Sequence, residues 1–324
     1  MSLITDYIKC GLLWTNRLQG NLQRLNIVTY DDKIRLRSPG YHRQILFGQA
    51  GHDCVRDLLS TDAPLMISRL GSVELSCLSW HIRKRRDTPR AYSNRVRTQM
   101  SNQAGFFPTD DASLDAFAKL YLDKIPLVDL MGVWFNSDED MICNTFCPGA
   151  DLVELSCLEP FRFTAPWSSL LAGKKVLVVH PFSESINSQY VKKRHCLFAD
   201  PDVLPEFELK TLTAVQSIAG SPVPFASWFD AYRHMCSEIE KTDFDVCLIG
   251  AGAYGLPLAA FVKELGRQAI HLGGATQILF GIRGRRWEEL YADTTAQLFN
   301  GHWVRPLAAE TPSNKEQIEK GCYW

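Results

Sequence analysis

A glycine-rich turn at residues 250–255 is the clearest candidate for binding chemistry in the sequence. Gly250, Gly252 and Gly255 form a GxGxxG pattern after the predicted strand 245–249, and Tyr254 lies inside the pattern. Backbone without side chains can approach phosphate oxygens closely, and the amides at the start of the following helix then face the anion. The pattern therefore predicts a diphosphate site. Close helix–strand packing is the alternative explanation of the same glycines.

The loop at residues 69–74 places an arginine and a glutamate around a glycine. Glu74 falls in the first turn of a predicted helix, where the helix dipole alone favours a carboxylate. The functional interpretation makes Glu74 a metal ligand or a catalytic carboxylate, with Arg69 contacting an anion or orienting Glu74. Gly71 and Ser72 then belong to the ligand-binding part of the loop.

A third loop follows the predicted strand 174–180, whose centre, 176–179, is apolar. His180 ends this strand and is a candidate to bind a phosphate or a sugar hydroxyl, or to act as an acid–base group. A hydrogen-bonded core histidine is the alternative. Ser183 and Ser185 suit phosphate contacts and helix N-caps equally well.

A second glycine-rich turn, formed by Gly273 and Gly274, precedes a basic segment. This segment contains Arg283, Arg285 and Arg286. Guanidinium groups suit a diphosphate, especially a leaving group whose charge grows during a reaction, and a solvated charge cluster is the alternative. Gln277, between the turn and the arginines, is a candidate to contact a base or a sugar edge.

The elements that must position these loops alternate along the chain. Strands are predicted at 63–69, 127–135, 174–180, 245–249 and 268–272, and helices at 74–82, 113–125 (with Ser113 as N-cap), 228–239 and 255–265 (closed by Gly266). This alternation predicts an α/β fold with a Rossmann-like, doubly wound, mostly parallel sheet and helices on both faces. Ligands bind beyond the carboxyl ends of the strands in such sheets, so the four loops are expected to share one cleft.

The first 60 residues are predicted to form a helical extension that packs on the body, which spans residues 61–324. Trp14, Leu18, Leu22 and Leu25 recur at helical spacing, as do the apolar residues of 54–59.

Composition limits the classes of partner and compartment. The 324 residues carry a formal net charge of −1, which gives no global attraction to nucleic acid or to an anionic membrane. The start of the sequence lacks a signal-peptide pattern, and no apolar run reaches the ~20 residues of a membrane span. The ten cysteines form no CxxC pair. We therefore expect a cytoplasmic protein with at most peripheral contact with the inner face of the membrane.

The strand after the glycine pattern tests whether the ligand is a nicotinamide dinucleotide. Such a site requires Asp or Glu about 20 residues after the glycines, at the end of the second strand. Here that strand ends in His271 and Leu272. An NAD(P)-dependent oxidoreductase is therefore disfavoured. The sequence also contains neither a GxxxxGK[ST] motif nor a GxSxG motif.

One motif resembles a known family. The segment Arg69-Leu-Gly-Ser-Val-Glu resembles the Arg-(aromatic/aliphatic)-Gly-Asp-Gly-Glu signature of bacterial GT-D-type glycosyltransferases, which carry a DxE motif. Segments 180–182, 245–258 and 273–287 resemble the rest of that family's Rossmann-like domain, and the final residues 321–324 are similar to the ending of related polysaccharide-locus proteins. The resemblance covers approximately residues 64–324.

The resemblance implies transfer of a sugar from a nucleotide-diphosphate donor, with a divalent metal held by the DxE carboxylates. The favoured function is a UDP-sugar-dependent glycosyltransferase that acts on a glycan or lipid-linked acceptor in bacterial surface polysaccharide or glycoprotein assembly. Ser72 takes the place of the motif's Asp, so Mn²⁺ or Mg²⁺ binding through Glu74 is expected to be weakened, absent or completed elsewhere. A non-catalytic nucleotide-sugar binding protein is the main alternative.

Overall fold

The structure is a computed structural model that describes residues 29–86, 91–289, 297–317 and 321–324. Within these residues the chain forms one sheet in the order β1-β4-β3-β2-β8-β7-β5-β6. The strands are β1 (Ile45–Leu46), β2 (Leu65–Arg69), β3 (Leu130–Val133), β4 (Asp151–Glu154), β5 (Lys175–His180), β6 (Glu208–Thr213), β7 (Val246–Ile249) and β8 (Gln268–His271). Every neighbouring pair is parallel, which confirms the predicted fold class.

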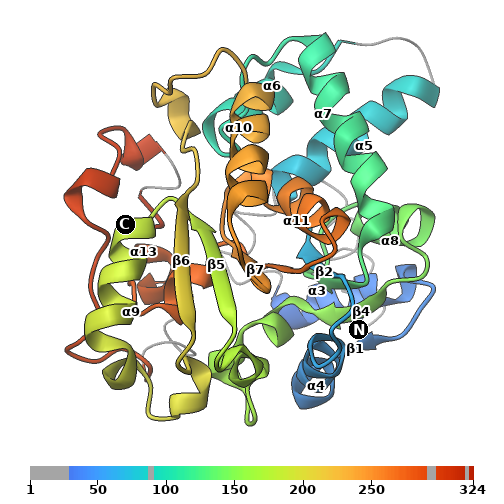
Figure 1. The fold of residues 1–324 in the computed structure, drawn as a ribbon. Helices are drawn as coiled ribbons and strands as arrows, with labels where there is room; N and C mark the ends of the chain where they lie inside the picture. The colour runs from blue at the N-terminus through green and yellow to red at the C-terminus, as the bar shows by residue number, and fades with distance from the viewer. Residues whose placement is uncertain (1–28, 87–90, 290–296, 318–320) are drawn as a thin grey trace.

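Helices lie on both faces of the sheet (Figure 1). They are α3 (Tyr30–Arg37), α4 (Gly48–Leu59), α5 (Ser72–Arg86), α6 (Asn94–Asn102), α7 (Asp111–Lys124), α8 (Glu139–Phe146), α9 (Ser183–Leu197), α10 (Trp228–Lys241), α11 (Gly255–Glu264), α12 (Ala275–Leu279) and α13 (Arg285–Glu289). Among the described residues, none of these helices combines the length and the apolar character that crossing a bilayer requires.

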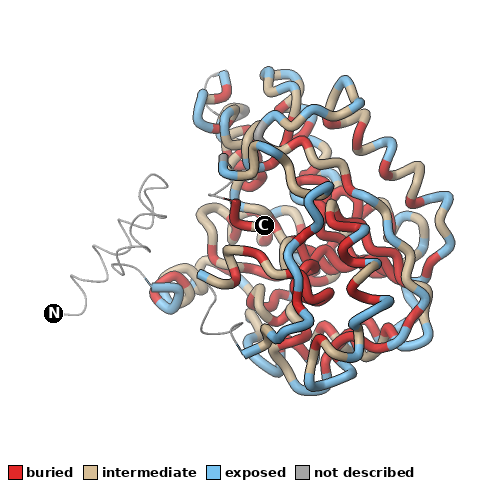
Figure 2. Tube along the Cα trace, turned by 90° about the vertical axis from the view of Figure 1, so that its left-hand side faces the viewer, coloured by how far each residue is buried: buried red, intermediate tan, exposed pale blue. Residues whose placement is uncertain are grey.

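The strands bury both of their faces, which explains their nearly continuous apolar runs. In β5, Leu177 and Val179 face the core under α5, α7, α10 and α11, whereas Val176 and Val178 face the core under α4 and α9. Figure 2 shows the buried segments gathered inside the exposed outer turns. The sheet is therefore a rigid support for the loops that leave it.

The sequence predictions and the observed elements differ in a few places. Helix α7 begins at Asp111, and its N-cap is Asp110 rather than Ser113, because the Asp110 carboxylate accepts the Ser113 N–H at 2.9 Å. Gly266 closes α11 as predicted, with a left-handed φ of 80°. Strands β1, β4 and β6 were not predicted. Strand β1 has only two residues, β4 begins and ends with an acidic residue and so lacks an apolar run, and β6 lies at an edge with alternating exposure.

The described residues include the N-terminal extension from residue 29 onward. The helical spacing from Trp14 to Leu25 lies outside the described residues, whereas residues 54–59 lie in α4 as predicted. Strand β1 pairs with β4 and so adds a strand from before residue 60 to the sheet. The domain boundary near residue 60 stays a prediction.

Candidate functional site

A cavity of about 180 Å³ opens at the carboxyl ends of β2, β8, β7 and β5, which are neighbours at the centre of the sheet. Twelve of the predicted site residues line it: Arg69, Gly71, Ser72, Glu74, His180, Gly250, Gly252, Tyr254, Gly273, Gly274, Gln277 and Arg286. The structure thus brings residues that are up to 217 positions apart to one site, since the list runs from Arg69 to Arg286.

Five other predicted residues do not line this cavity. Ser183 bonds to the Thr213 hydroxyl at 2.6 Å, and Ser185 is held by the Glu310 carboxylate. Arg285 pairs with Glu289 at 2.6 Å (Nε to Oε1), and the backbone of Arg283 pairs with Val304. Gly255 lies below the cavity in the first turn of α11. These serines and arginines are thus bonded to other residues of the chain, and their spacing in the sequence does not predict those bonds.

Two glycines of the GxGxxG pattern lie against histidine rings that leave no room for a side chain. A Cβ built on Gly250 would overlap the His180 ring and approach the carbonyl oxygen of Gly273 to 2.7 Å. A Cβ built on Gly255 would overlap the His271 ring. The packing explanation of the pattern therefore applies to these two positions.

Gly252 has a different role in the same turn. Its φ is 52°, a left-handed conformation, and nothing lies within 4 Å of where its Cβ would be. It is exposed and lines the cavity. Gly252 is therefore the glycine of the pattern that leaves backbone open to a ligand.

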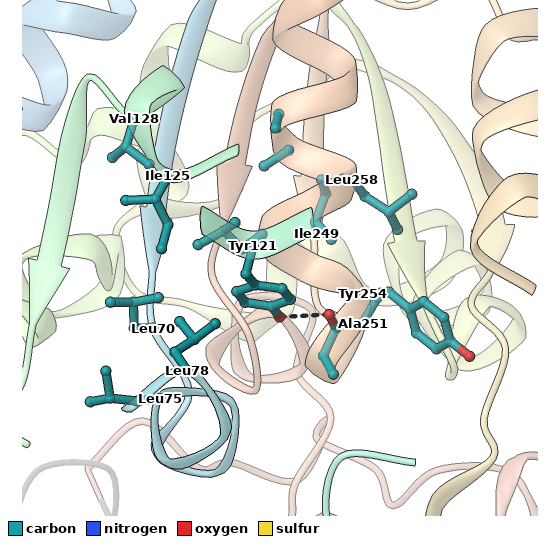
Figure 3. Close-up of a cluster of buried hydrophobic side chains, with 14 of the residues drawn as sticks. Leu70, Leu75, Leu78, Tyr121, Ile125, Val128, Ile249, Ala251, Tyr254 and Leu258 are labelled. Atoms are coloured by element: carbon teal, nitrogen blue, oxygen red, sulfur yellow. Dashed lines mark hydrogen bonds between the residues drawn. The ribbon is translucent and has the colours of Figure 1, made fainter. Parts of the chain in front are cut away.

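The glycine turn is anchored from the α7 and α10 side. The Tyr121 hydroxyl of α7 donates to the Ala253 carbonyl at 2.6 Å (Figure 3). The Tyr254 ring stacks on Trp228 of α10, with ring centroids 4.5 Å apart and planes 3° from parallel. These contacts fix the turn before any ligand binds.

His180 is held as a neutral hydrogen-bond donor. Its Nδ1 accepts the Phe182 N–H at 2.9 Å, and burial lowers the pKa of His180 to about 3. A neutral imidazole that accepts through Nδ1 carries its proton on Nε2. This arrangement suits donation to a phosphate or sugar oxygen, and it suits proton abstraction poorly because the basic nitrogen is already engaged.

His271 is a cavity residue that sequence reasoning missed as a functional candidate. It ends β8, faces the Ser68 hydroxyl at 3.2 Å through Nδ1, and lies under Gly255. Burial and the nearby charge of Arg69 lower the pKa of His271 to about 3. Its position at the end of a strand, like that of His180, was the available signal.

Two arginines of the cavity are stacked on aromatic rings. The Arg69 guanidinium carbon lies 4.7 Å from the Trp134 ring centre, and that of Arg286 lies 4.7 Å from the Tyr323 ring centre. Arg286 also donates to the Tyr323 hydroxyl at 3.2 Å. Stacking holds each planar guanidinium in place, and the Nε of Arg69 has no hydrogen-bond partner among the described residues. Two fixed cations in one cavity favour an anionic ligand.

Glu74 is the carboxyl group of the cavity. Its side chain is 9% exposed and folds over Gly71, where a Cβ would overlap the carboxylate. Burial raises the pKa of Glu74, against the opposing effects of its own backbone N–H and of Arg69. A carboxylate with a raised pKa is a stronger proton acceptor once it is ionised. Gly71 is thus needed for the Glu74 conformation.

The residues around Glu74 do not fit a divalent metal site. Mn²⁺ and Mg²⁺ require several oxygen ligands, usually with more than one carboxylate. Ser72 offers a hydroxyl in place of the motif's Asp, and the charged group acting on Glu74 is the Arg69 cation. Across the described ranges, no three His, Cys, Asp or Glu side chains gather closely enough to hold a metal ion.

The remaining cavity wall contains residues without a sequence signal. Trp134 follows β3, and Gln216, Ser217 and Ile218 follow β6, while Gln103 ends α6. The 215–218 segment was missed because β6 itself was not predicted. Gln277, which was predicted, donates through Nε2 to the carbonyls of Ile282 and Tyr323, each at 3.2 Å, and its buried Oε1 has no partner in the described residues.

No protein-family model and no curated protein matches the chain. Solved structures similar to it include a selenomethionine-substituted domain of unknown function 1792, with 14% identity, a TM-score of 0.48 and coverage of 88% of this chain and 98% of that one. Another is a glycosyltransferase of the same domain from Streptococcus sanguinis, with 14% identity, a TM-score of 0.38 and coverage of 86% and 100%.

A third similar structure, with 14% identity and a TM-score of 0.46, covers 90% of this chain and 98% of its own. It is described as domain of unknown function 1792 with a distinct glycosyltransferase fold. Two of the three similar structures are thus described with the word glycosyltransferase, and the other only as a domain of unknown function. Because the TM-scores lie below 0.5, the similarity does not transfer an activity, and the function of this chain rests on its own residues.

Proposed function

We propose that this protein transfers a sugar from a nucleotide-diphosphate donor, UDP-linked, to a glycan or lipid-linked acceptor in bacterial surface polysaccharide or glycoprotein assembly. One observation carries the proposal: two ring-stacked arginines and one buried carboxyl share a cavity at the carboxyl ends of four neighbouring parallel strands. This is the edge at which α/β sheets bind nucleotide ligands.

The donor's diphosphate is assigned to the arginine side of the cavity. Arg69 and Arg286 supply the cations, and the open backbone at Gly252 lies in the same wall. The Nε of Arg69 is buried without a protein partner in the described part of the chain, which supports a ligand oxygen as its acceptor. His180 donates its Nε2 proton to a second oxygen of the donor.

The transfer step uses Glu74 as the base. The acceptor hydroxyl gives its proton to the Glu74 carboxylate, and the acceptor oxygen forms a bond to the anomeric carbon. The bond from that carbon to the diphosphate oxygen breaks, and the leaving nucleoside diphosphate keeps the electron pair. The fixed charges of Arg69 and Arg286 stabilise the growing negative charge, which is where preorganised electrostatics accelerates such reactions.

The test is a comparison of Glu74→Gln with a control, Glu184→Gln. Glu184 also lies in the first turn of a helix, but it does not line the cavity. Wild type and both variants should show the same rise in melting temperature with UDP. Only Glu74→Gln should lose transfer and donor hydrolysis from a panel of UDP- and GDP-sugars, measured with and without Mn²⁺. Full turnover in Glu74→Gln would remove this residue from the mechanism, and stabilisation by NAD(H) but not by UDP or GDP would favour an oxidoreductase.

A non-catalytic nucleotide-sugar binding protein is a second candidate because Ser72 replaces the motif's Asp and the residues around Glu74 lack a metal donor set. The same experiment separates the two. Stabilisation by UDP-sugars in the wild type, with neither transfer nor hydrolysis of any donor with or without Mn²⁺, would favour the binding protein.

A further inference from the structure

A second groove, of about 450 Å³, begins where the donor cavity ends. Ser72 lines both of them, and Glu74 stands two residues further along the same helical turn. One wall is a single face of α5, with lining residues at positions 72, 75, 76, 79, 80 and 83. Helix α6 and the loop 136–138 form the other walls. The groove and the donor cavity therefore meet at Ser72, two residues before the proposed catalytic carboxylate.

The lining of this groove is rich in hydroxyl and amide groups. Its neutral polar members are Ser72, Ser76, Ser79, Ser93, Gln99, Asn136 and Ser137. Trp80 adds an indole, which combines a large apolar ring with a polar N–H group. Arg83 is neutralised by Asp138, because its Nη2 lies 2.8 and 2.7 Å from the two carboxylate oxygens. Arg95, the other cation, is not free either.

Three polar groups on these walls lack partners in the described residues. They are the Ser79 hydroxyl, the Trp80 indole N–H and the Asn136 side-chain amide nitrogen. Ser79 is only 6% exposed. An unsatisfied buried donor costs about 1–3 kcal/mol, and these three belong to residues that line the groove, where a bound acceptor can supply the missing partners once their side chains turn toward it.

We propose that this groove binds the acceptor and that the acceptor presents a neutral, hydroxyl-rich saccharide there. The proposal rests on the transferase function given above. A saccharide matches the groove because its hydroxyl groups both accept and donate hydrogen bonds, and its apolar ring face can pack on Trp80. Bound in this groove, a sugar can extend one hydroxyl past Ser72 to Glu74.

The experiment compares Gln99→Trp with Thr98→Trp on an array of immobilised glycans, with fluorescently labelled full-length protein and saturating UDP. Residue 99 lines the groove, whereas Thr98 is the exposed neighbour on the same helix. Wild type and Thr98→Trp should bind the same neutral glycans. Gln99→Trp should bind them at least tenfold more weakly, with an unchanged melting-temperature shift with UDP.

A second variant keeps the groove open. The double substitution Ser79→Ala/Trp80→Phe removes two of the unpartnered donors without adding bulk, and should weaken glycan binding several-fold. Equal glycan binding by wild type and Gln99→Trp, binding only to anionic glycans, or no glycan binding by the wild type would each overturn the acceptor assignment. If the UDP shift persists in those cases, only the groove assignment fails. Loss of the UDP shift in the wild type would instead overturn the donor site.

Discussion

Replacing Glu139 by Gln should change how the protein's stability depends on pH. Glu139 is fully buried at the start of α8, and one of its carboxylate oxygens accepts from the Tyr41 hydroxyl at 2.8 Å and from the N–H groups of Trp134 and Asn136 at 3.1 Å each. It thereby fixes the segment 134–138, which carries Trp134 of the donor cavity and the 136–138 wall of the groove.

The direction of the pKa change decides whether the free energy of unfolding rises or falls with pH. Burial raises the pKa of Glu139 from its usual 4.5 to about 7. Between these pH values the folded protein keeps the proton and the unfolded chain releases it, so the free energy of unfolding falls as pH rises. The difference corresponds to about 3 kcal/mol, at about 1.4 kcal/mol for each pH unit. The loss should begin near pH 4.5 and level off above pH 7.

Urea unfolding followed by tryptophan fluorescence from pH 4.5 to 8 measures this effect. The gap in unfolding free energy between wild type and Glu139→Gln should shift by about 3 kcal/mol in favour of the variant across that range. Thr98→Ala, at an exposed and uncharged position on α6, should give a gap that does not vary with pH. A constant gap for Glu139→Gln as well would refute the reasoning, since it would mean that burial does not perturb this carboxyl.

Two further substitutions probe the donor cavity. Gly255→Ala should destabilise the fold by about 1–3 kcal/mol, because the new methyl group must displace the His271 ring, whereas Gly149→Ala, at an open position, should leave the thermal midpoint nearly unchanged. Arg286→Lys keeps the charge but loses the planar stack on Tyr323, so UDP should bind about tenfold more weakly by calorimetry. Arg285→Lys, outside the cavity, should bind UDP like the wild type. Equal UDP affinities of Arg286→Lys and Arg285→Lys would show that stacking on Tyr323 does not position Arg286.

The central part of the fold could be predicted from sequence because its strands are buried on both faces. Strands β2, β5, β7 and β8 appear as apolar runs, and each is followed by a loop that lines the cavity. The edge strands gave weaker patterns. Strand β6 alternates between exposed and half-buried residues, so the cavity segment that follows it could not be placed.

Individual site residues were harder to predict than the loops that carry them. A glycine pattern does not show whether a bare Cα faces a ligand, as at Gly252, or a side chain distant in sequence, as at Gly250 and Gly255. Ser183 and Ser185 follow a strand end in the expected way, yet Thr213 and Glu310 hold them away from the cavity. Tertiary packing determines such partners, so they cannot be predicted from the spacing of residues in the sequence.

The strand order also governs when the cavity can exist during synthesis. Without β8, the described strands fall into two unconnected groups, β1-β4-β3-β2 and β7-β5-β6, because β8 alone joins β2 to β7. A nascent chain that stops short of residue 268 can therefore form two partial sheets, but these sheets do not yet hold Arg69 and Gly252 next to each other. Ligand binding must emerge late, after a contact that spans some 200 residues has closed, and such distant pairings form slowly.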